Sequence, residues 1–418
     1  HDLKLIYPKT HARYSSRSPK VYLDALNRDY LAGRSVWNIL SDDLMIPALV
    51  AQGKRLEDAR RYLVSGCWGV ATEGCEPAAG APYFNLLRIL EASIRPDPQL
   101  AAKTGLALRS IEDAADFAEV YDIYADNLRR TIGLVCTAAR EIGRHAPEVA
   151  PECFYSACLS DCLERHLDAT AGGGRYNPQN FAIMSFANTV DSLVAIDELC
   201  FRRKRLGLPE FLAAVRADWR DQAALRAEVL GLPHFGDHTP ASQGMAKRLF
   251  DDIHAATQAR ENARGGKFQL AFFVYREFIF WGRKMGATPD GRRAGERLSQ
   301  GISPSQQYPA SDLTDLIRSI AQLDLRRCGN SAVVYLNLPV DGMSLDHLET
   351  FERTCASMGV SMLQPNCVST EELLDAKAHP ENHPGLVVRV CGFSAKFTSL
   401  LPEWQDEFIA RRIYGRSA

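Results

Sequence analysis

The sequence predicts an α/β fold in which amphipathic helices alternate with short buried strands. Residues 333–338 and 386–390 are short, apolar and rich in β-branched side chains, as buried strands are. Residues 83–93, 111–142 and 190–201 repeat apolar residues at three- and four-residue spacing, which predicts helices. The chain has 418 residues, 46% of them hydrophobic, and can bury the core of one large domain or two ordinary ones.

The first half is predicted to be mainly helical, with loops rich in small residues. Residues 21–63 alternate helical patterns with short breaks, and the run EDARR at 57–61 leads a helix into the loop SGCWG at 65–69. Residues 170–177 read TAGGGRYN, a glycine cluster that no regular element would carry. We expect this second loop to approach another part of the molecule closely, because glycine has no side chain to prevent it.

The second half changes character. Residues 287–293, ATPDGRR, have the composition of a turn, since Pro and Gly set the backbone angles and Asp bonds to its own backbone. The two predicted strands follow, and the second of them, residues 386–390, runs directly into Cys391 and Gly392. The chain contains no internal repeat, low-complexity tract or clear linker.

Composition favours small-molecule chemistry. The formal net charge is -2, without a long run of either sign, so nothing indicates a surface for nucleic acid or an anionic membrane. No stretch approaches the roughly 20 apolar residues of a membrane span, and no basic-then-apolar leader precedes the first periodic segment. We therefore expect a cytoplasmic protein that binds neither nucleic acid nor membrane.

The eleven cysteines do not predict a metal site. They are scattered and form no CxxC pair, whereas zinc and iron–sulfur sites draw on closely spaced thiols. Cys153, Cys158 and Cys162 come nearest to such a cluster without matching a standard ligand spacing. We expect no metal, and most of these side chains to be reduced, buried and packed as small apolar residues.

Cys67 is a candidate catalytic residue because its thiol lies in a glycine-bounded loop. One alternative is a buried structural cysteine. A second is a nucleophile, which needs a base and an orienting partner, and no histidine lies near it in the sequence. A third is a thiol that loses a hydrogen atom, because a thiyl radical is close in energy to many carbon radicals and can take a hydrogen from a substrate carbon and return it.

Gly392 is the second candidate. A radical at a glycine α-carbon is delocalised onto both flanking amides and becomes planar without a side-chain clash. The alternative is a glycine that only provides a positive φ in a hairpin tip after the predicted strand.

The sequences around both residues resemble those of the pyruvate formate-lyase-like glycyl radical enzymes. Residues 371–412 contain RVCGFSA, which is similar to the RVxGYSA signature of the family, with Phe393 in place of the tyrosine. Residues 44–69, LMIPALVAQGKRLEDARRYLVSGCWG, resemble the approach to the active-site cysteine loop. The segments DATAGGGRYN, ANTVDSLVAID, GATPDGRRAGERLSQGISPS and MLQPNCV also follow the family in order. This resemblance implies a radical on Gly392 and a thiyl radical on Cys67.

The resemblance also implies a fold. The family has a ten-stranded α/β barrel made of two five-stranded halves, with the cysteine and glycine loops meeting inside. Only 66 residues precede Cys67, so the first half-barrel should be largely missing from this chain. On this basis residues 1–370 are a barrel portion carrying the cysteine loop and residues 371–418 a glycyl radical domain. Either the chain is a fragment or an N-terminal companion subunit completes the barrel, and an oligomer is expected because open strand edges favour partners.

The implied activity is that of a lyase acting on a small organic substrate. No bound cofactor is implied; an activating enzyme that uses S-adenosylmethionine would install the radical on Gly392. Dehydratases and the choline lyase of the family carry a glutamate two positions after the cysteine, and here that position is Gly69, so Glu73 or Glu76 would have to act as acid or base. Cleavage of a C–C or C–heteroatom bond, decarboxylation and radical addition to an alkene all stay open.

Four further residues are candidate substrate contacts. Trp68 follows the cysteine, Phe84 lies in a stretch that resembles the family's FFN, and Arg175 and Asn177 follow the glycine cluster. Core packing for the aromatic residues and fold-supporting hydrogen bonds for the polar ones are the alternatives. Two further readings of the chain are a catalytic subunit of a split decarboxylase or radical-addition synthase, and a replacement radical domain without activity of its own.

Overall fold

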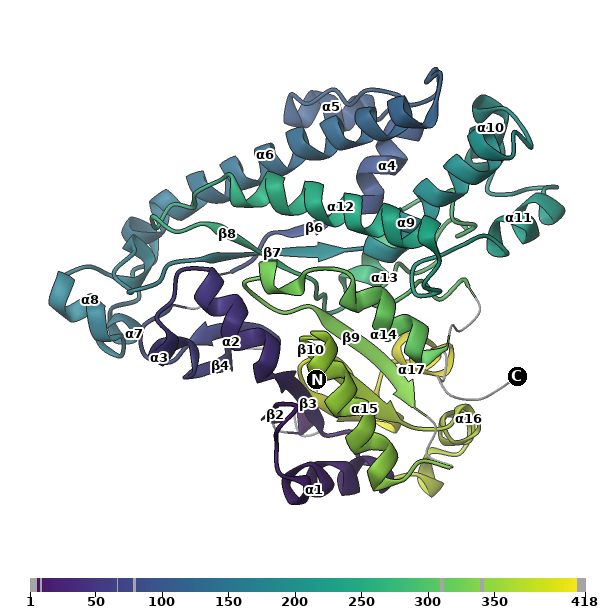
Figure 1. The fold of residues 1–418 in the computed structure, drawn as a ribbon. Coiled ribbons are helices and arrows are strands. Elements are labelled where there is room, and N and C mark those ends of the chain that lie inside the picture. The colour runs from purple at the N-terminus through teal and green to yellow at the C-terminus, as the bar shows by residue number, and fades with distance from the viewer. Residues whose placement is uncertain are drawn as a thin grey trace.

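The computed structural model describes residues 6–7, 10–65, 67–77, 80–308, 312–338 and 342–411. It confirms the α/β class, with helices packed against short strands (Figure 1). The α-helices are α1 (Lys20–Leu31), α2 (Asp42–Ala51), α3 (Leu56–Ala59), α4 (Leu86–Ile94), α5 (Pro98–Thr104), α6 (Phe117–Val149), α7 (Cys153–Ala157), α8 (Ser160–Arg165), α9 (Phe186–Ile196), α10 (Leu208–Arg216), α11 (Ala223–Leu230), α12 (Pro240–Gln258), α13 (Glu277–Gly282), α14 (Leu313–Ala321), α15 (Leu345–Met358), α16 (Thr370–Ala378) and α17 (Pro402–Ile409).

The strands form four sheets. They are β1 (Ile6–Tyr7), β2 (Thr10–Tyr14), β3 (Trp37–Ser41), β4 (Tyr62–Ser65), β5 (Gly69–Thr72), β6 (Tyr83–Asn85), β7 (Gln179–Met184), β8 (Phe268–Ala271), β9 (Val333–Leu338), β10 (Met362–Cys367), β11 (Val387–Arg389) and β12 (Ser394–Lys396). The sheet orders are β1-β12-β11, β2-β3-β10-β9, β4-β5 and β6-β7-β8. Within these, β6-β7-β8 is entirely parallel, and β3 pairs antiparallel with β10.

Two of these sheets continue into each other. Phe272, directly after β8, forms a parallel bridge with Ala332, directly before β9. Its amide donates to the carbonyl of Ser331 at 2.7 Å, and the amide of Val333 donates back to Phe272 at 3.1 Å. Strands β6, β7, β8, β9, β10, β3 and β2 therefore make one continuous arc.

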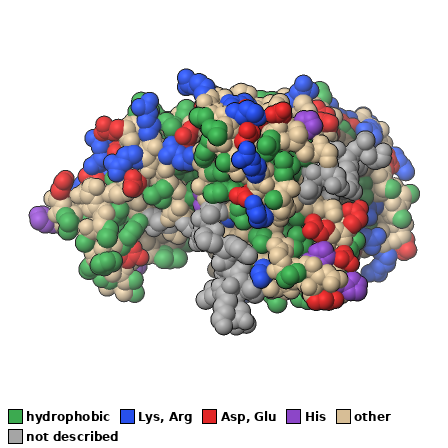
Figure 2. Space-filling view, turned by 90° about the horizontal axis from the view of Figure 1, so that it is seen from below, with side chains coloured by type: hydrophobic (Ala, Val, Ile, Leu, Met, Phe, Trp, Pro, Cys, Tyr) green, Lys and Arg blue, Asp and Glu red, His purple; other side chains and the backbone are tan. Residues whose placement is uncertain are grey.

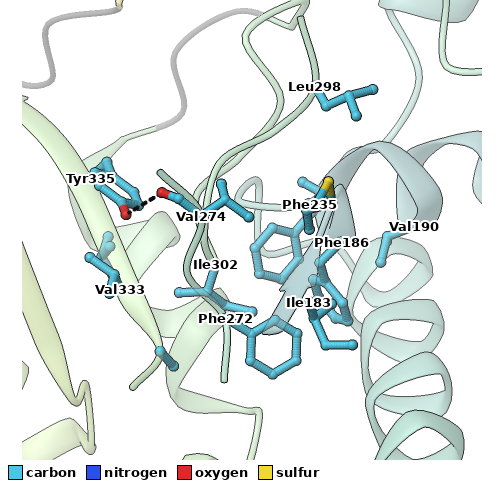
Figure 3. Packing of buried hydrophobic residues seen from close by; sticks show 14 of the residues in the cluster. Ile183, Phe186, Val190, Phe235, Phe272, Val274, Leu298, Ile302, Val333 and Tyr335 are labelled. Carbon is cyan, nitrogen blue, oxygen red and sulfur yellow. Dashed lines mark hydrogen bonds between the residues drawn. The ribbon is translucent and has the colours of Figure 1, made fainter. Parts of the chain in front are cut away.

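The long helices cover this arc on its outer side. In Figure 1, α6 and α12 run side by side along β7 and β8, while α1 and α15 pack together at the other end, against β10. Aromatic side chains pack against one another between the helices and the sheet. Phe186 of α9 packs edge-to-face on both Phe235 and Phe272, with ring centres 5.4 and 5.5 Å apart (Figure 3). These helices hold the arc in place, and the ends of its strands surround the candidate site.

The structure corrects two details of the sequence prediction. Residues 83–85 form strand β6, whereas periodicity predicted a helix from residue 83; the helix begins at Leu86 because the Asn85 side chain caps it by accepting from the Arg88 amide. The region 21–63 also contains β3 and β4 between its helices. The predicted strand at 333–338 is confirmed without change.

The surface mixes charge and apolar groups. Figure 2 shows acidic, basic and hydrophobic side chains all occurring over the face seen from below. No helix within the described residues combines the length and the apolar character needed to cross a membrane. Nor do the described residues bring together three or more His, Cys, Asp or Glu side chains in a way that could hold a metal ion.

One buried carboxyl group makes stability depend on pH. Glu352 of α15 is 2% exposed, and Asn27 of α1 donates a hydrogen bond of 3.0 Å to it. Burial raises the pKa of Glu352 to about 7, and the Asn27 hydrogen bond only partly opposes this. The folded state therefore holds this proton more tightly than the unfolded state. The stabilisation is fully present below the ordinary glutamate pKa and is lost as the pH rises through about 7.

We expect Glu352→Gln to remove this dependence. Glutamine keeps the shape and the carbonyl oxygen that Asn27 needs, but it carries no charge at any pH. The variant should be more stable than the wild type at pH 8 by about 2–3 kcal/mol and similar to it at pH 4. Denaturant unfolding at both pH values measures the difference, and Glu57→Gln, at an exposed site, is the control. An equal gain or loss at both pH values would contradict the role of Glu352.

Candidate active site

Two hairpins carry the predicted radical residues. Cys67 lies in the turn between β4 and β5, which pair antiparallel with Ser65 opposite Gly69. Gly392 lies in the tip of the β11–β12 hairpin, where Arg389 pairs with Ser394 and the Val390 amide donates to the Phe393 carbonyl at 3.0 Å. Each tip follows a short strand whose partner fixes its direction.

The two tips are in contact. A side-chain Cβ built on Gly392 would overlap the Cα and Cβ of Cys67 and lie 2.5 Å from its carbonyl oxygen. The φ of Gly392 is outside the left-handed region, so the turn itself does not demand glycine. Gly392 is required because any side chain would enter the space of Cys67. The structure thus brings the two predicted radical positions together and does not support the alternative of a glycine needed only for positive φ.

A buried arginine holds the glycine hairpin. Arg389 has no exposed surface, and its guanidinium donates to the carbonyls of Gly392 at 3.0 Å and Val36 at 2.8 Å and to the Ser394 hydroxyl at 3.1 Å. Burial lowers the pKa of Arg389 to about 10, which leaves it charged at neutral pH. The Gly392 carbonyl, one of the two groups over which a radical would delocalise, is therefore fixed against a cation.

Cys67 opens onto a cavity of about 220 Å³. Trp68, fully buried, forms one wall and packs edge-to-face on His11 and Tyr335, with ring centres 6.0 and 6.4 Å away. The Nε2 atom of His11, on β2, lies 3.1 Å from the Cys67 carbonyl and links the cysteine turn to the arc. The lining residues are Ser65, Cys67, Trp68, Gly69, Val70, Ala71, Glu76, Pro77, Ala81, Tyr83, Pro178, Asn180, Gln269 and Phe273.

Carboxamide side chains make the polar end of this cavity. Asn180 accepts hydrogen bonds from Asn330 at 2.6 Å and from Gln269 at 2.8 Å. Within the part of the chain that the structure describes, the Oε1 atom of Gln269 is buried without a hydrogen-bond partner. A Cβ built on Gly329 would lie 2.5 Å from this oxygen, so the Oε1 atom faces the protein beside Gly329 and not the cavity.

The two candidate glutamates occupy different environments. Glu76 is 5% exposed, lines the cavity, pairs with the buried Lys54 and accepts a 2.7 Å hydrogen bond from the Thr72 amide. Glu73 has an exposed side chain that pairs with Arg61 at 3.3 Å and does not line the cavity. Among the carboxylates of the described residues, Glu76 is thus the one that lines this cavity.

The predicted substrate contacts also separate. Trp68 lines the cavity, whereas Phe84 is buried behind it against Phe181, with ring centres 5.3 Å apart. Arg175 makes ion pairs with Asp58 at 3.2 Å and Asp161 at 3.0 Å. Asn177 donates to the carbonyls of Gly172 and Gly174 at 3.0 and 2.7 Å, which ties the glycine cluster together. Arg175 and Asn177 support the loop and are not among the residues that line the cavity.

Sequence reasoning missed Tyr83, Asn180, Gln269 and Phe273. Asn180 lies three positions beyond the glycine-rich segment 170–177, and polar residues at the start of the otherwise apolar β7 were the available signal. Gln269 gives a similar signal, as the one polar residue in β8. Nothing in the sequence connects these strands to Cys67, because the contact exists only after the parallel sheet has formed.

Comparison with known families shows the family to which the chain belongs. A model of the pyruvate formate lyase-like family matches residues 1–279, and a glycine radical model matches residues 298–398, which include Gly392. The chain belongs to the pyruvate formate lyase-like family.

Relatives in this family include enzymes of several specificities. The chain is 26% identical to trans-4-hydroxy-L-proline dehydratase of Clostridioides difficile, over 98% of this chain and 53% of that protein. It is 26% identical to isethionate sulfite-lyase of Oleidesulfovibrio alaskensis, over 98% and 51%. The glycerol-bound B12-independent glycerol dehydratase from Clostridium butyricum superposes with a TM-score of 0.91 at 27% identity, over 98% of this chain and 53% of that one. The chain spans about half the length of these relatives.

Proposed function

We propose that the chain is the catalytic part of a glycyl radical lyase. The observation that carries this proposal is the contact of Gly392 with Cys67 at the wall of a cavity. An activating enzyme that uses S-adenosylmethionine removes one hydrogen atom from the Gly392 α-carbon. The Gly392 radical takes the hydrogen of the Cys67 thiol, and the Cys67 thiyl takes a hydrogen from a substrate carbon. A neighbouring C–C or C–heteroatom bond then breaks, and the product radical recovers the hydrogen from Cys67.

The cavity indicates the kind of substrate. About 220 Å³ accommodates a small organic molecule, with Trp68, Tyr83 and Phe273 against its apolar part. Asn180 lines the cavity and its Oδ1 atom already accepts from Asn330 and Gln269, so its amide N–H groups would bind an oxygen of the substrate. Burial protects the radicals from solvent and oxygen, so the active state should be strictly anaerobic.

Glu76 is the candidate acid or base for an elimination. Gly69 occupies the position where dehydratases of the family have a glutamate, and Glu76 lines the same cavity. Its partner Lys54 could receive or return the proton that Glu76 exchanges with a leaving group. A decarboxylase or a radical-addition enzyme would not need this carboxylate, so a variant at Glu76 separates these chemistries.

The curved sheet supports completion of the barrel by other strands. Strands β2 and β6 end the arc, and among the described residues no further strand pairs with the outer edge of either. Unpaired edges are sites for strand addition. The missing part would be the family's first half-barrel, supplied by an N-terminal companion subunit or by preceding sequence. The assembly would act in an anaerobic cytoplasm.

Electron paramagnetic resonance tests the radical without knowledge of the substrate. The protein, with a cognate activating enzyme and S-adenosylmethionine under anaerobic conditions, should give a doublet from the one remaining α-hydrogen. Growth with α-deuterated glycine should collapse this doublet to a singlet when the protein is activated in deuterium oxide, so that exchange through the Cys67 thiol returns no protium to Gly392. Exposure to oxygen should then cleave the chain at Gly392, which mass spectrometry of the fragments locates among the 29 glycines.

Isotope labelling is preferable to Gly392→Ala, because an alanine methyl group would overlap Cys67 and disturb both turns. A signal that appears only after addition of an N-terminal companion would assign the split form of the enzyme. A persistent doublet in deuterated-glycine protein, or no signal with or without the companion, would refute a glycyl radical in this chain.

A further inference from the structure

A second thiol lies directly behind the active-site cysteine. Cys391, the residue before Gly392, has no exposed surface. Its Sγ donates to the Val274 carbonyl at 3.4 Å and lies 3.7 Å from the Tyr335 hydroxyl. Figure 3 shows Tyr335 and Val274 joined by their own hydrogen bond of 3.4 Å. These contacts hold the thiol among buried groups, and Cys391 is not one of the residues that line the cavity.

Cys391 also faces Cys67. A Cβ built on Gly392 would lie 2.1 Å from the Cα of Cys67, and consecutive Cα atoms are about 3.8 Å apart, so the Cα atoms of Cys391 and Cys67 are at most about 7.4 Å apart. The hydrogen bond between the Cys67 and Cys391 side chains brings their sulfur atoms together within this limit. Disulfides bridge roughly 4.4–6.8 Å between Cα atoms. Burial raises the pKa of the Cys391 thiol, and the adjoining Cys67 thiol raises it further, while Tyr335 and Trp68 lower it. The Cys67 and Cys391 thiols therefore lie close enough for one to change the ionisation of the other.

The two thiols differ in access. Cys67 is partly exposed and lines the cavity, so a small oxidant can reach it from the substrate side. Cys391 has no exposed surface and does not line the cavity, so an oxidant in the cavity meets Cys67 first. This arrangement is that of a first-reacting thiol with a resolving thiol at its back.

We propose that Cys67 and Cys391 form a reversible disulfide that closes the radical site when the resting enzyme meets an oxidant. The oxidant is a small-molecule disulfide such as oxidised glutathione. The Cys67 thiolate attacks it, forming a Cys67–glutathione mixed disulfide and releasing one glutathione thiolate. Cys391 then attacks the Cys67 sulfur, forming the Cys67–Cys391 bond; the second glutathione leaves and takes the Cys391 proton. One external disulfide is reduced to two thiols, and the protein loses two hydrogen atoms.

The consequence for activity rests on the proposed function. In the disulfide state Cys67 has no hydrogen to give to a Gly392 radical, so the radical cannot pass to substrate. The same bond prevents Cys67 from reaching the irreversible higher oxidation states of sulfur. Reduction by a dithiol restores both thiols. The pair would thus preserve an enzyme that cannot work in oxygen until anaerobic, reducing conditions return.

Peptide mapping of the unactivated wild-type protein tests this pair. The reduced protein is treated anaerobically with oxidised glutathione, alkylated, digested and analysed by mass spectrometry. We expect a cross-linked pair of peptides that contain Cys67 and Cys391. Its mass should be lower by two hydrogen atoms than the sum of the two reduced peptides, and it should be lost on treatment with dithiothreitol. Modification of the exposed Cys153 and Cys158 reports that the reagent has acted.

Two variants identify the partner. Cys391→Ala should leave Cys67 as a stable glutathione mixed disulfide, whereas Cys355→Ala, at a fully buried thiol on α15, should leave the cross-link intact. The proposal is overturned if wild-type Cys67 stays glutathionylated beside a free Cys391, or if Cys67 is untouched while Cys153 and Cys158 are modified. Because no radical is generated in this experiment, its failure leaves the proposed lyase function intact, and failure of the radical experiment leaves the disulfide intact.

Discussion

Cys67→Ser is expected to abolish turnover and to leave the radical on Gly392 in place. Serine has the shape of cysteine, and the atoms of Cys67 nearest to Gly392 are its Cα, Cβ and carbonyl oxygen, which serine retains. An O–H bond, however, is too strong to give its hydrogen to a glycyl radical. Turnover should fall to the uncatalysed level, a loss of at least about 10⁶-fold. The doublet spectrum should persist at wild-type spin count.

Cys75→Ser is the matched control for this experiment. Cys75 is a buried thiol close in sequence that donates to the Thr72 carbonyl at 3.9 Å and does not line the cavity. A serine there keeps a donor for the same carbonyl, so activity should be retained. Turnover is followed with small hydroxylated or aminated compounds that fit the cavity. Activity in Cys67→Ser would show that Cys67 does not carry the hydrogen transfer. Loss of the radical from a folded Cys67→Ser protein would show that the Gly392 radical depends on Cys67.

The two proposed radical positions could be located in the sequence because their signals are local. Cys67 and Gly392 each lie in a turn beside a short strand, and the residues around them form continuous motifs in the sequence. The strand at 333–338 was likewise predictable, since six consecutive buried residues leave little alternative. Residues 83–85 were misjudged because β6 is only three residues long and exists through its parallel pairing with β7. Such pairing joins distant segments of the chain, and the periodicity of a local sequence cannot predict it.

The remainder of the site depends on contacts between distant residues. The sequence alone shows Arg175 as a cation beside a glycine loop with no acidic neighbour. In the fold it forms ion pairs with Asp58 and Asp161. Gln269 reads as an ordinary strand residue, but the arc turns it toward the cavity of Cys67. Cys391 reads as one of many scattered thiols until the two hairpin tips meet. In each case the sequence supplies the side chain and the sheet topology supplies its neighbour.

Breaking the buried pair of Lys54 and Glu76 should have the largest effect on stability. Both side chains are almost fully buried, at 2% and 3% exposure. Lys54→Met would leave the nearly buried Glu76 carboxylate without its ion-pair partner, and the Thr72 amide would stay as its hydrogen-bond donor. Removing one member of a buried ion pair costs about 3–5 kcal/mol, because the desolvation of the other is no longer compensated. Denaturant unfolding should show this loss, and an unchanged midpoint would contradict it.

The double variant Lys54→Met, Glu76→Leu separates the structural role of Glu76 from a chemical one. Replacing both charges by apolar side chains of similar size is often neutral or stabilising, so most of the lost stability should return. If Glu76 is the acid or base of an elimination, the stable double variant still forms the glycyl radical but does not turn over substrate. If the pair serves only the fold, the double variant regains activity together with stability. The second result would move the chemistry toward a decarboxylation or an addition, for which the cavity needs no carboxylate at this position.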